Sequence, residues 1–119
     1  MNDSIDFEKM GGLAPAIVQD ADTGEVLMLG FMNAESLALT QKTGFVTFYS
    51  RTRKKLWMKG ETSGNRLEVL YASTDCDVDT LLFRVRVQGD GLVCHEGTRS
   101  CFTKELPVAP RPSAAEVKR

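Results

Sequence analysis

The chain has 119 residues, a length that fits one domain and leaves no room for a second catalytic domain. Hydrophobic residues make up 42% and charged residues 26%, the balance of a globular protein, and the net charge of −1 argues against binding to nucleic acid or to a membrane. The N-terminus is polar, no apolar run approaches a membrane span and the cysteines number three, so we expect a reduced, cytoplasmic protein whose cysteines are thiols or metal ligands.

The first predicted elements are two strands joined by a turn. Residues 15–19 and 25–32 are apolar runs, and the residues between them, 20–24, are turn formers. This pattern predicts a β-hairpin. Because the second run is apolar at nearly every position, we expect its strand to be buried on both faces.

One helix is predicted after the hairpin. Asn33 is a good N-cap, residues 34–42 include several helix formers, and Gly44 stands where a C-terminal cap belongs. Residues 45–50 and 56–59 then predict two short strands on either side of a basic turn, followed by a loop.

Two later segments have the alternating pattern of strands. Residues 66–73 and 80–88 alternate between apolar and polar side chains. The apolar side chains predicted to share a face are Leu67, Val69 and Tyr71 in the first strand, and Leu81, Phe83, Val85 and Val87 in the second. Arg84, Arg86 and Gln88 are predicted to face the other way.

These elements together predict the fold class. It is α+β, mostly antiparallel β-sheet with one main helix, in a single domain over residues 1–103. Residues 104–119 contain three prolines within six positions and then small and polar residues, so we expect a mobile tail there.

Three carboxylates recur with a period of two, at Asp75, Asp77 and Asp79. In an extended backbone their side chains project from one face, and that of Cys76 projects from the other. Three like charges repel one another unless a cation neutralises them, and hard oxygen ligands suit Mg²⁺. The alternative is a solvated acidic turn.

The three cysteines are the second candidate metal site. Cys76, Cys94 and Cys101 provide soft ligands of the kind that suits Zn²⁺, although their spacing is not that of a zinc finger. Three buried thiols are one alternative, against which their polar neighbours argue. A closed site that includes His95 is another, but His95 adjoins Cys94 and neighbouring side chains of an extended backbone diverge. We favour three cysteine ligands and a fourth position for water, with His95 as a nearby proton shuttle.

The arrangement around Cys76 also predicts how many metal sites there are. Cys76 and the three aspartates face opposite sides of an extended segment, so one ion cannot easily use both sets of ligands. The sequence therefore predicts two metal sites, one on either side of one strand. A loop that gathers all four side chains would contradict this prediction.

A basic stretch and the loop after it form a candidate phosphate cradle. Arg51 and Arg53 can offer bidentate donors, Lys59 a point charge, and Thr62 and Ser63 hydroxyl groups. The stretch matches neither a Walker loop nor a dinucleotide-binding fingerprint. A basic surface turn followed by a flexible loop is an equally good interpretation of the composition alone.

Taken together, these segments resemble the phosphoribosyl-AMP cyclohydrolases, a family of histidine-biosynthesis enzymes, over about residues 12–102. The matching segments are 15–20, 24–33, 50–51, 56–57, 59–65, 75–79, 94–95 and 99–102. The pieces DCDVD at 75–79 and CH…RSCF at 94–102 are the most specific of these. Departures are minor, with Thr52 where the family commonly has Ser and Thr80 where it commonly has Ala.

The resemblance implies a cofactor set and an assembly. It implies one Zn²⁺ per subunit on Cys76, Cys94 and Cys101 within an intertwined homodimer, with Cys76 donated across the interface. It also implies one Mg²⁺ per subunit on the three aspartates and a proton-transfer role for His95. We add Arg99 to the basic and hydroxyl residues above as a predicted substrate-binding residue.

The resemblance also implies an activity. The substrate would be 1-(5-phosphoribosyl)-AMP, whose adenine ring is opened by hydrolysis at the N1–C6 bond by a zinc-activated water. The product would be the formimino-aminoimidazole carboxamide ribotide intermediate of histidine biosynthesis. The length favours the monofunctional form, without the pyrophosphohydrolase domain to which some family members are fused.

Two rival functions differ in class. A zinc deaminase also attacks a ring carbon, but the H-x-E…P-C-x-x-C signature is missing from the chain. A small zinc-stabilised binding module would need a closed fourth ligand and would tolerate the loss of His95. Replacing that histidine therefore separates an enzyme from a binding module.

Overall fold

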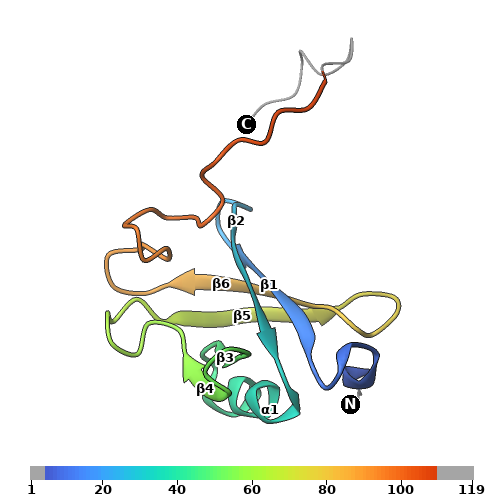
Figure 1. The fold of residues 1–119 in the computed structure, drawn as a ribbon. Helices are drawn as coiled ribbons and strands as arrows, with labels where there is room; N and C mark the ends of the chain where they lie inside the picture. Colours follow the sequence, from blue (N-terminus) through green and yellow to red (C-terminus); the bar gives the residue numbers. More distant parts are fainter. Residues whose placement is uncertain (1–4, 110–119) are drawn as a thin grey trace.

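The computed structural model describes residues 5–109 (Figure 1). Its elements are η1 (Phe7–Met10), β1 (Ala14–Asp20), β2 (Val26–Met32), α1 (Ala34–Thr43), β3 (Thr47–Ser50), β4 (Lys55–Met58), β5 (Leu67–Thr74) and β6 (Leu81–Val87). One sheet has the strand order β2-β1-β6-β5, and β3 pairs with β4 in a second sheet. Only β1 and β6 pair in parallel. The α+β prediction, mostly antiparallel with one main helix, is confirmed for the described residues.

Strands β1 and β2 form the predicted hairpin. They pair antiparallel from Ala14 opposite Met32 to Gln19 opposite Val26. The expectation that β2 is buried on both faces holds in part. Leu27 and Met28 point to opposite faces and are both buried, whereas Val26 and Leu29 are each 44% exposed. Strand β2 lies at the edge of the described sheet, where β1 is its one strand neighbour, so part of the strand is left uncovered.

Helix α1 begins and ends at the predicted caps. The Asn33 side chain accepts a hydrogen bond from Ser36 N at 2.8 Å, and Ser36 Oγ accepts one from Asn33 N at 2.9 Å. Gly44 ends the helix with a φ of 83°. The helix is joined to β3 through Thr40, whose Oγ1 accepts a hydrogen bond from Thr47 N at 2.9 Å.

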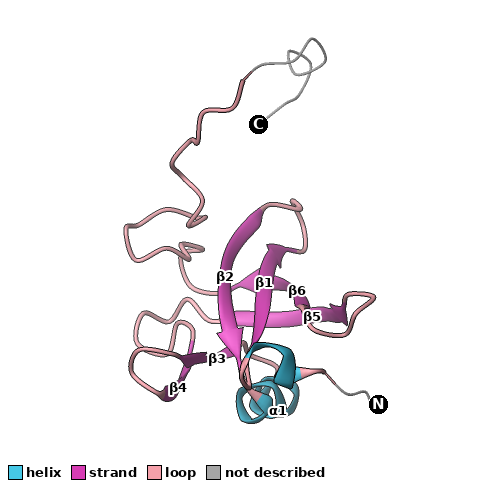
Figure 2. Ribbon diagram, turned by 45° about the vertical axis from the view of Figure 1, so that its right-hand side comes forward, coloured by secondary structure: helices cyan, strands magenta, loops and turns pink. Residues whose placement is uncertain are grey.

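The second sheet packs against the first near β2. Phe48 of β3 is 1% exposed, and a Cβ atom at Gly30 would lie 2.6 Å from its ring. On its other side, the ring of Phe48 lies 5.3 Å from that of Trp57 in β4. Figure 2 shows α1 and the β3–β4 pair together at one side of the four-stranded sheet. This contact places β4 and the loop after it beside the first sheet.

Strand β5 departs from the predicted alternation. A register shift between Val69 and Tyr71 leaves Leu70 without a partner on β6. Tyr71 therefore pairs with Arg84 instead of continuing the face of Val69, and it is 53% exposed. The Arg84 guanidinium lies 5.2 Å from the centre of its ring. The prediction that Tyr71 shares a face with Leu67 and Val69 is wrong.

Strand β6 follows the prediction closely. Leu81, Phe83 and Val85 are buried, whereas Arg84 and Arg86 are exposed. After β6 the chain forms turns as far as residue 101, and residues 102–109 extend away from the sheet (Figure 1). Most of the predicted mobile tail, residues 110–119, lies outside the described part of the chain. Between residues 5 and 109, no helix is long and apolar enough to cross a membrane.

Candidate active site

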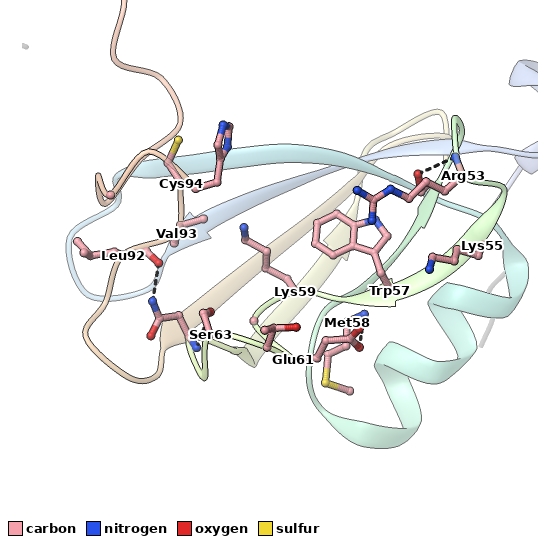
Figure 3. Close-up of a pocket in the computed structure, with 16 residues that line it drawn as sticks. Arg53, Lys55, Trp57, Met58, Lys59, Glu61, Ser63, Leu92, Val93 and Cys94 are labelled. Carbon is pink, nitrogen blue, oxygen red and sulfur yellow. Dashed lines mark hydrogen bonds between the residues drawn. The ribbon is translucent and has the colours of Figure 1, made fainter.

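A cleft of about 730 Å³ lies between the β3–β4 pair, the loop after β4 and the loop after β6 (Figure 3). The predicted site residues that line it are Arg53, Lys59, Thr62, Ser63, Cys94 and His95. The structure thus brings the candidate phosphate cradle to the same cleft as one candidate zinc ligand and the only histidine.

One wall of the cleft is cationic and aromatic. Arg53, Lys55 and Lys59 line it together with Trp57, whose ring centre lies 5.7 Å from Lys59 Nζ. In Figure 3, Lys59 extends between Trp57 and the loop that carries Cys94. Cations can hold phosphate groups, and a half-buried aromatic ring beside them can pack against a planar base. The residues predicted by name to bind substrate did not include Lys55 and Trp57, although Lys55 belongs to the predicted basic stretch and Trp57 to a segment that carries the family resemblance.

Asn65 joins the two loops that border the cleft. It is 8% exposed, and its Nδ2 donates to Asp90 Oδ1 at 2.7 Å and to Leu92 O at 2.9 Å. Its Oδ1 accepts a hydrogen bond from Asp90 N at 3.1 Å. One buried amide therefore holds the loop after β4 against the loop after β6. The sequence prediction did not assign this role, because the two loops are far apart along the chain.

Gly60 lies directly against this junction. Its φ is +83°, and an added Cβ atom would lie 2.3 Å from the backbone of Asn65. We expect Gly60→Ala to lower the free energy of unfolding by about 1–3 kcal/mol more than Gly64→Ala does. Gly64 is the matched control, since its φ is +86° with no atom within 4 Å of an added Cβ. Urea denaturation of the two variants measures the difference, and equal losses would contradict the steric argument.

The loop after β6 folds back at Cys94. Thr98 O accepts hydrogen bonds from Val93 N at 3.1 Å and from Cys94 N at 3.0 Å. Gly97 N donates to Cys94 O at 2.9 Å, which closes the turn. His95 is exposed at the tip of this turn and lines the cleft.

Cys94 and Cys101 lie near enough to each other for each side chain to affect the pKa of the other. The backbone N–H of Glu96 is the main cause that lowers the pKa of Cys94, helped by the side chains of Thr98 and Cys101. Burial, followed by the contact with Cys94, raises the pKa of Cys101. Cys94 is therefore the more acidic of the two thiols, and two neighbouring sulfur atoms of this kind suit a soft metal ion.

Cys76 lies far from the other two cysteines. It is exposed in the loop between β5 and β6, whereas Cys94 and Cys101 follow β6. Strand β6 spans seven residues, so its two ends are about 20 Å apart. The two loops lie at opposite ends of the strand in Figure 1. A single chain therefore does not bring its three cysteines to one ion.

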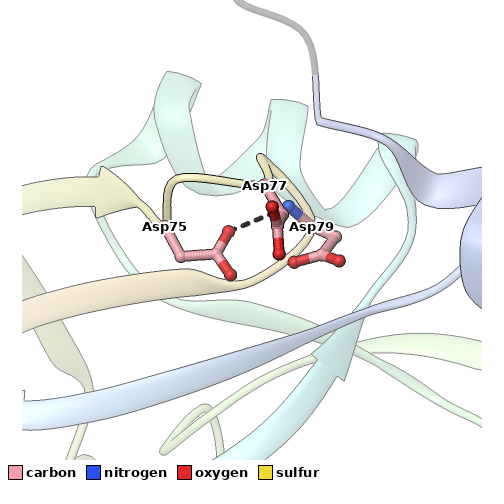
Figure 4. A group of neighbouring side chains, drawn as sticks. All are labelled: Asp75, Asp77 and Asp79. Atoms are coloured by element: carbon pink, nitrogen blue, oxygen red, sulfur yellow. Dashed lines mark hydrogen bonds between the residues drawn. The ribbon is translucent and has the colours of Figure 1, made fainter.

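The three aspartates do lie together (Figure 4). One carboxylate oxygen from each of Asp75, Asp77 and Asp79 lies within 4.8 Å of the others, a spacing that fits a hard divalent cation. Their segment is a turn, however, so the prediction of an extended backbone is wrong. Val78 has a φ of 53°, and Asp75 Oδ1 accepts hydrogen bonds from Asp79 N at 3.0 Å and Thr80 N at 3.2 Å. These hydrogen bonds replace strand pairing.

The charges of this turn are partly balanced within the chain. Burial raises the pKa of Asp75, but the hydrogen bonds that it accepts from the backbone N–H groups of Asp79 and Thr80 outweigh burial and lower it. Lys9 Nζ lies 3.1 Å from Asp79 Oδ2. Cys76 does not belong to the carboxylate group, although its Sγ is 4.0 Å from Asp77 Oδ1. The separation into two metal sites stays a prediction.

Two of the predicted substrate-binding residues lie outside the cleft lining. The Arg51 guanidinium lies 4.2 Å from the ring centre of Phe31. Arg99 donates from Nη2 to Asp20 Oδ2 at 2.7 Å and from Nε to Glu25 Oε1 at 3.1 Å. Their contacts with substrate stay predictions.

The ion pair at Asp20 predicts a dependence of stability on pH. Burial raises the pKa of Asp20, but N–H groups of Thr23 and Asp22 and the Arg99 guanidinium outweigh it and lower the pKa below its ordinary value of 3.8. The carboxylate therefore stabilises the fold fully above that value, and this stabilisation is lost as pH falls through the lower folded pKa. We expect Asp20→Asn to cost stability at pH 7 and progressively less below about pH 4. Urea unfolding from pH 7 to 2 measures this, with the exposed Asp22→Asn as control, and a constant difference would contradict it.

Fold and cleft together define a class of protein. A small α+β domain has a cleft where cations, hydroxyl groups and an aromatic ring meet a thiol and a histidine. These are the surroundings of a hydrolytic site for a phosphorylated substrate with a planar ring.

Comparison with known proteins identifies the family within this class. The model of the phosphoribosyl-AMP cyclohydrolase family matches residues 28–103. The chain belongs to the phosphoribosyl-AMP cyclohydrolase family, a family of hydrolases, which confirms the resemblance found in the sequence.

Relatives named phosphoribosyl-AMP cyclohydrolase match most of the chain. The protein from Solibacter usitatus (strain Ellin6076) is 55% identical over 103 residues, which cover 87% of this chain and 81% of the relative. The protein from Geotalea uraniireducens (strain Rf4) is 56% identical, with coverages of 82% and 78%. That from Desulfatibacillum aliphaticivorans is 58% identical, with coverages of 84% and 79%.

Proposed function

We propose that this chain hydrolyses the N1–C6 bond of the adenine ring of 1-(5-phosphoribosyl)-AMP and so forms the formimino-aminoimidazole carboxamide ribotide intermediate of histidine biosynthesis. Family membership supports the reaction. The observation that carries the mechanism is the cleft that Cys94 and His95 line together with Lys59 and Trp57. It combines a position for a metal-bound water with groups that can hold a phosphorylated purine.

The proposed zinc ligands are Cys94 and Cys101 of one subunit and Cys76 of another. The proximity of Cys94 and Cys101 and the lowered pKa of Cys94 support this assignment, because thiolates are the ligands that zinc prefers. Zinc bound there would supply a water of lowered pKa. His95 would take a proton from that water or deliver one to the leaving ring nitrogen.

The separation of Cys76 from the other cysteines supports a homodimer in which subunits share each site. Exposed apolar side chains lie on the strand before Cys76 and in its own loop, with Leu70 and Tyr71 on β5 at 45% and 53% exposure and Val78 at 42%. Val78 also lines an apolar hollow of about 220 Å³, together with Leu37. Apolar surface of this kind is typical of an interface.

The aspartates are proposed to act in the same shared site. They flank Cys76 in sequence, so a subunit that donates Cys76 brings Asp75, Asp77 and Asp79 with it. Mg²⁺ held there would offset their charge and accept a phosphate or ribose oxygen. Lys59 would hold a phosphate from the other side of the cleft.

Metal analysis combined with a ring-opening assay tests the proposed function. We expect about one zinc per chain in the purified protein and turnover of 1-(5-phosphoribosyl)-AMP that a chelator abolishes and zinc restores. The assay also measures ammonia, because a deaminase releases ammonia and a ring-opening hydrolase does not. Ammonia release would favour the deaminase, and tightly bound zinc without turnover would favour a binding module.

A further inference from the structure

We propose that Arg99 positions the thiol pair of Cys94 and Cys101 by fastening their loop to the β1–β2 hairpin, and that it acts through Asp20 rather than on the substrate. The inference rests on the proposed function in one respect, the role of the two thiols as metal ligands. It assigns to Arg99 a role different from the one predicted from the sequence.

The segment around Arg99 follows the open edge of β2 residue by residue. Strand β2 pairs with β1 on one side, and residues 99–101 lie along residues 25–27. The contacts are Arg99 Nε to Glu25 Oε1 at 3.1 Å, Ser100 Oγ to Val26 O at 2.8 Å, and Cys101 N to Leu27 O at 2.8 Å. Arg99 therefore lies at one end of this three-residue contact with residues 25–27, and Cys101 lies at the other end.

The anchor on the hairpin is a buried carboxylate. The Asp20 side chain is 10% exposed, and its Oδ1 accepts hydrogen bonds from Asp22 N at 2.8 Å and Thr23 N at 3.0 Å. Its Oδ2 accepts the Arg99 hydrogen bond at 2.7 Å. The β1–β2 turn therefore fixes the carboxylate, and the carboxylate fixes the guanidinium. A buried carboxylate without that guanidinium would lack its charged partner.

Arg99 lies between the two hydrogen bonds that place the thiols. Thr98, directly before it, accepts the backbone N–H of Cys94, and Cys101 is two residues after it. A shift of Arg99 along the hairpin would move both anchor points and change the distance between the sulfur atoms. The guanidinium lies outside the cleft lining, and two of its nitrogens already donate to carboxylates. Positioning therefore explains its contacts better than substrate binding.

The test measures the geometry of the thiol pair without zinc and without turnover. In a Cys76→Ser background, phenylarsine oxide binds the remaining two thiols together, with loss of water, only if they can reach one arsenic atom. We expect Arg99→Ala to weaken this dithiol capture by about 10- to 100-fold, the usual effect of removing a group that orients metal ligands. Arg99→Lys keeps the positive charge but loses the two forked donors of the guanidinium, so it should restore part of the affinity for the arsenical.

Two further variants test whether Arg99 affects dithiol capture through Asp20. Arg86→Ala is the matched control, because Arg86 pairs with Glu68 at 3.9 Å on the β5–β6 pair, away from the thiol loop. It should leave capture unchanged. Asp20→Asn should weaken capture, and the double variant with Arg99→Ala should be no worse than Arg99→Ala alone.

The outcomes separate this inference from the proposed function. If Arg99→Ala, or the milder Arg99→Lys should the first not fold, captures the arsenical as tightly as its parent, the inference is wrong. If Arg99→Ala raised the KM of the intact enzyme and left dithiol capture in the Cys76→Ser background unchanged, Arg99 would be a substrate-binding residue. We expect instead that Arg99→Ala lowers the kcat of the intact enzyme and weakens its zinc retention at nearly constant KM. Weakened capture in a protein that never opens the ring would uphold the inference and contradict the proposed function.

Discussion

An equal mixture of Cys76→Ser and Cys94→Ser chains, dissociated and reassembled together, is expected to regain about a quarter of wild-type turnover, whereas each variant alone is inactive. In a heterodimer, one site lacks both Cys76 and Cys94 and the other has all its ligands. Random reassembly makes about half of the dimers heterodimers, each with one intact site of two, and this arithmetic yields the quarter.

The length of β6 is the physical basis for this expected recovery of turnover. Its seven residues separate the loop of Cys76 from the turn of Cys94 by about 20 Å, several times the reach of ligands bound to one zinc ion. In the proposed site, a second copy of the chain would therefore bring its Cys76 sulfur to Cys94 and Cys101.

The matched control combines Cys94→Ser with Cys101→Ser. Both replacements lie in the same half of the proposed site, so one site of that heterodimer lacks Cys94 and the other lacks Cys101. No recovery is expected there. Native mass spectrometry measures how much heterodimer each mixture contains. Absence of recovery in a Cys76→Ser and Cys94→Ser mixture rich in heterodimer would refute the shared site.

His95→Ala is expected to lower kcat by about 10²- to 10⁴-fold, the range over which a positioned acid–base group acts. Zinc content should stay at the wild-type level, because His95 is proposed to move a proton and not to bind the metal. The chain contains no other histidine that could take its place. Steady-state kinetics and zinc analysis on the same preparation measure both quantities.

Glu96→Gln serves as the neighbouring control. Glu96 is exposed on the same turn, and its Oε1 lies 3.9 Å from Lys104 Nζ, so its replacement tests general disturbance of the turn. Near-normal turnover in His95→Ala would remove the histidine from the mechanism. Loss of zinc with loss of turnover would instead make His95 a fourth ligand, as in a closed structural site.

The parts of the fold that were predictable are those that depend on near neighbours in the chain. The caps at Asn33 and Gly44 act within one helical turn, and both are confirmed. The alternation of β6 is confirmed because Phe83 and Val85 face the core and Arg84 faces solvent. These features can be predicted from side-chain chemistry together with the period of two residues in a strand and 3.6 residues in a helix.

The predictions that were wrong depend on distant partners. The expectation for β2 held only in part, since Leu27 and Met28 are buried on opposite faces, whereas the place of the strand at the edge of the sheet leaves Val26 and Leu29 exposed. The bulge at Leu70 reverses the face of Tyr71, and nothing in the local pattern indicates it. The loop around Asp75 reads as a strand from its alternating residues, yet hydrogen bonds to its own carboxylate close it as a turn.

The same division holds for the candidate site. The sequence alone determined the chemical groups, with three cysteines, three aspartates, one histidine and a basic stretch, because the motifs that contain them are specific to the family. Only the tertiary structure decided which groups meet. Sheet order and strand length bring Cys94 into the same cleft as Lys59 and Trp57 and carry Cys76 to the opposite end of β6. They also pair Arg99 with Asp20, so that Arg99 does not line the cleft. Distances between residues remote in sequence are set by how strands pair and pack, and local residue patterns do not contain that information.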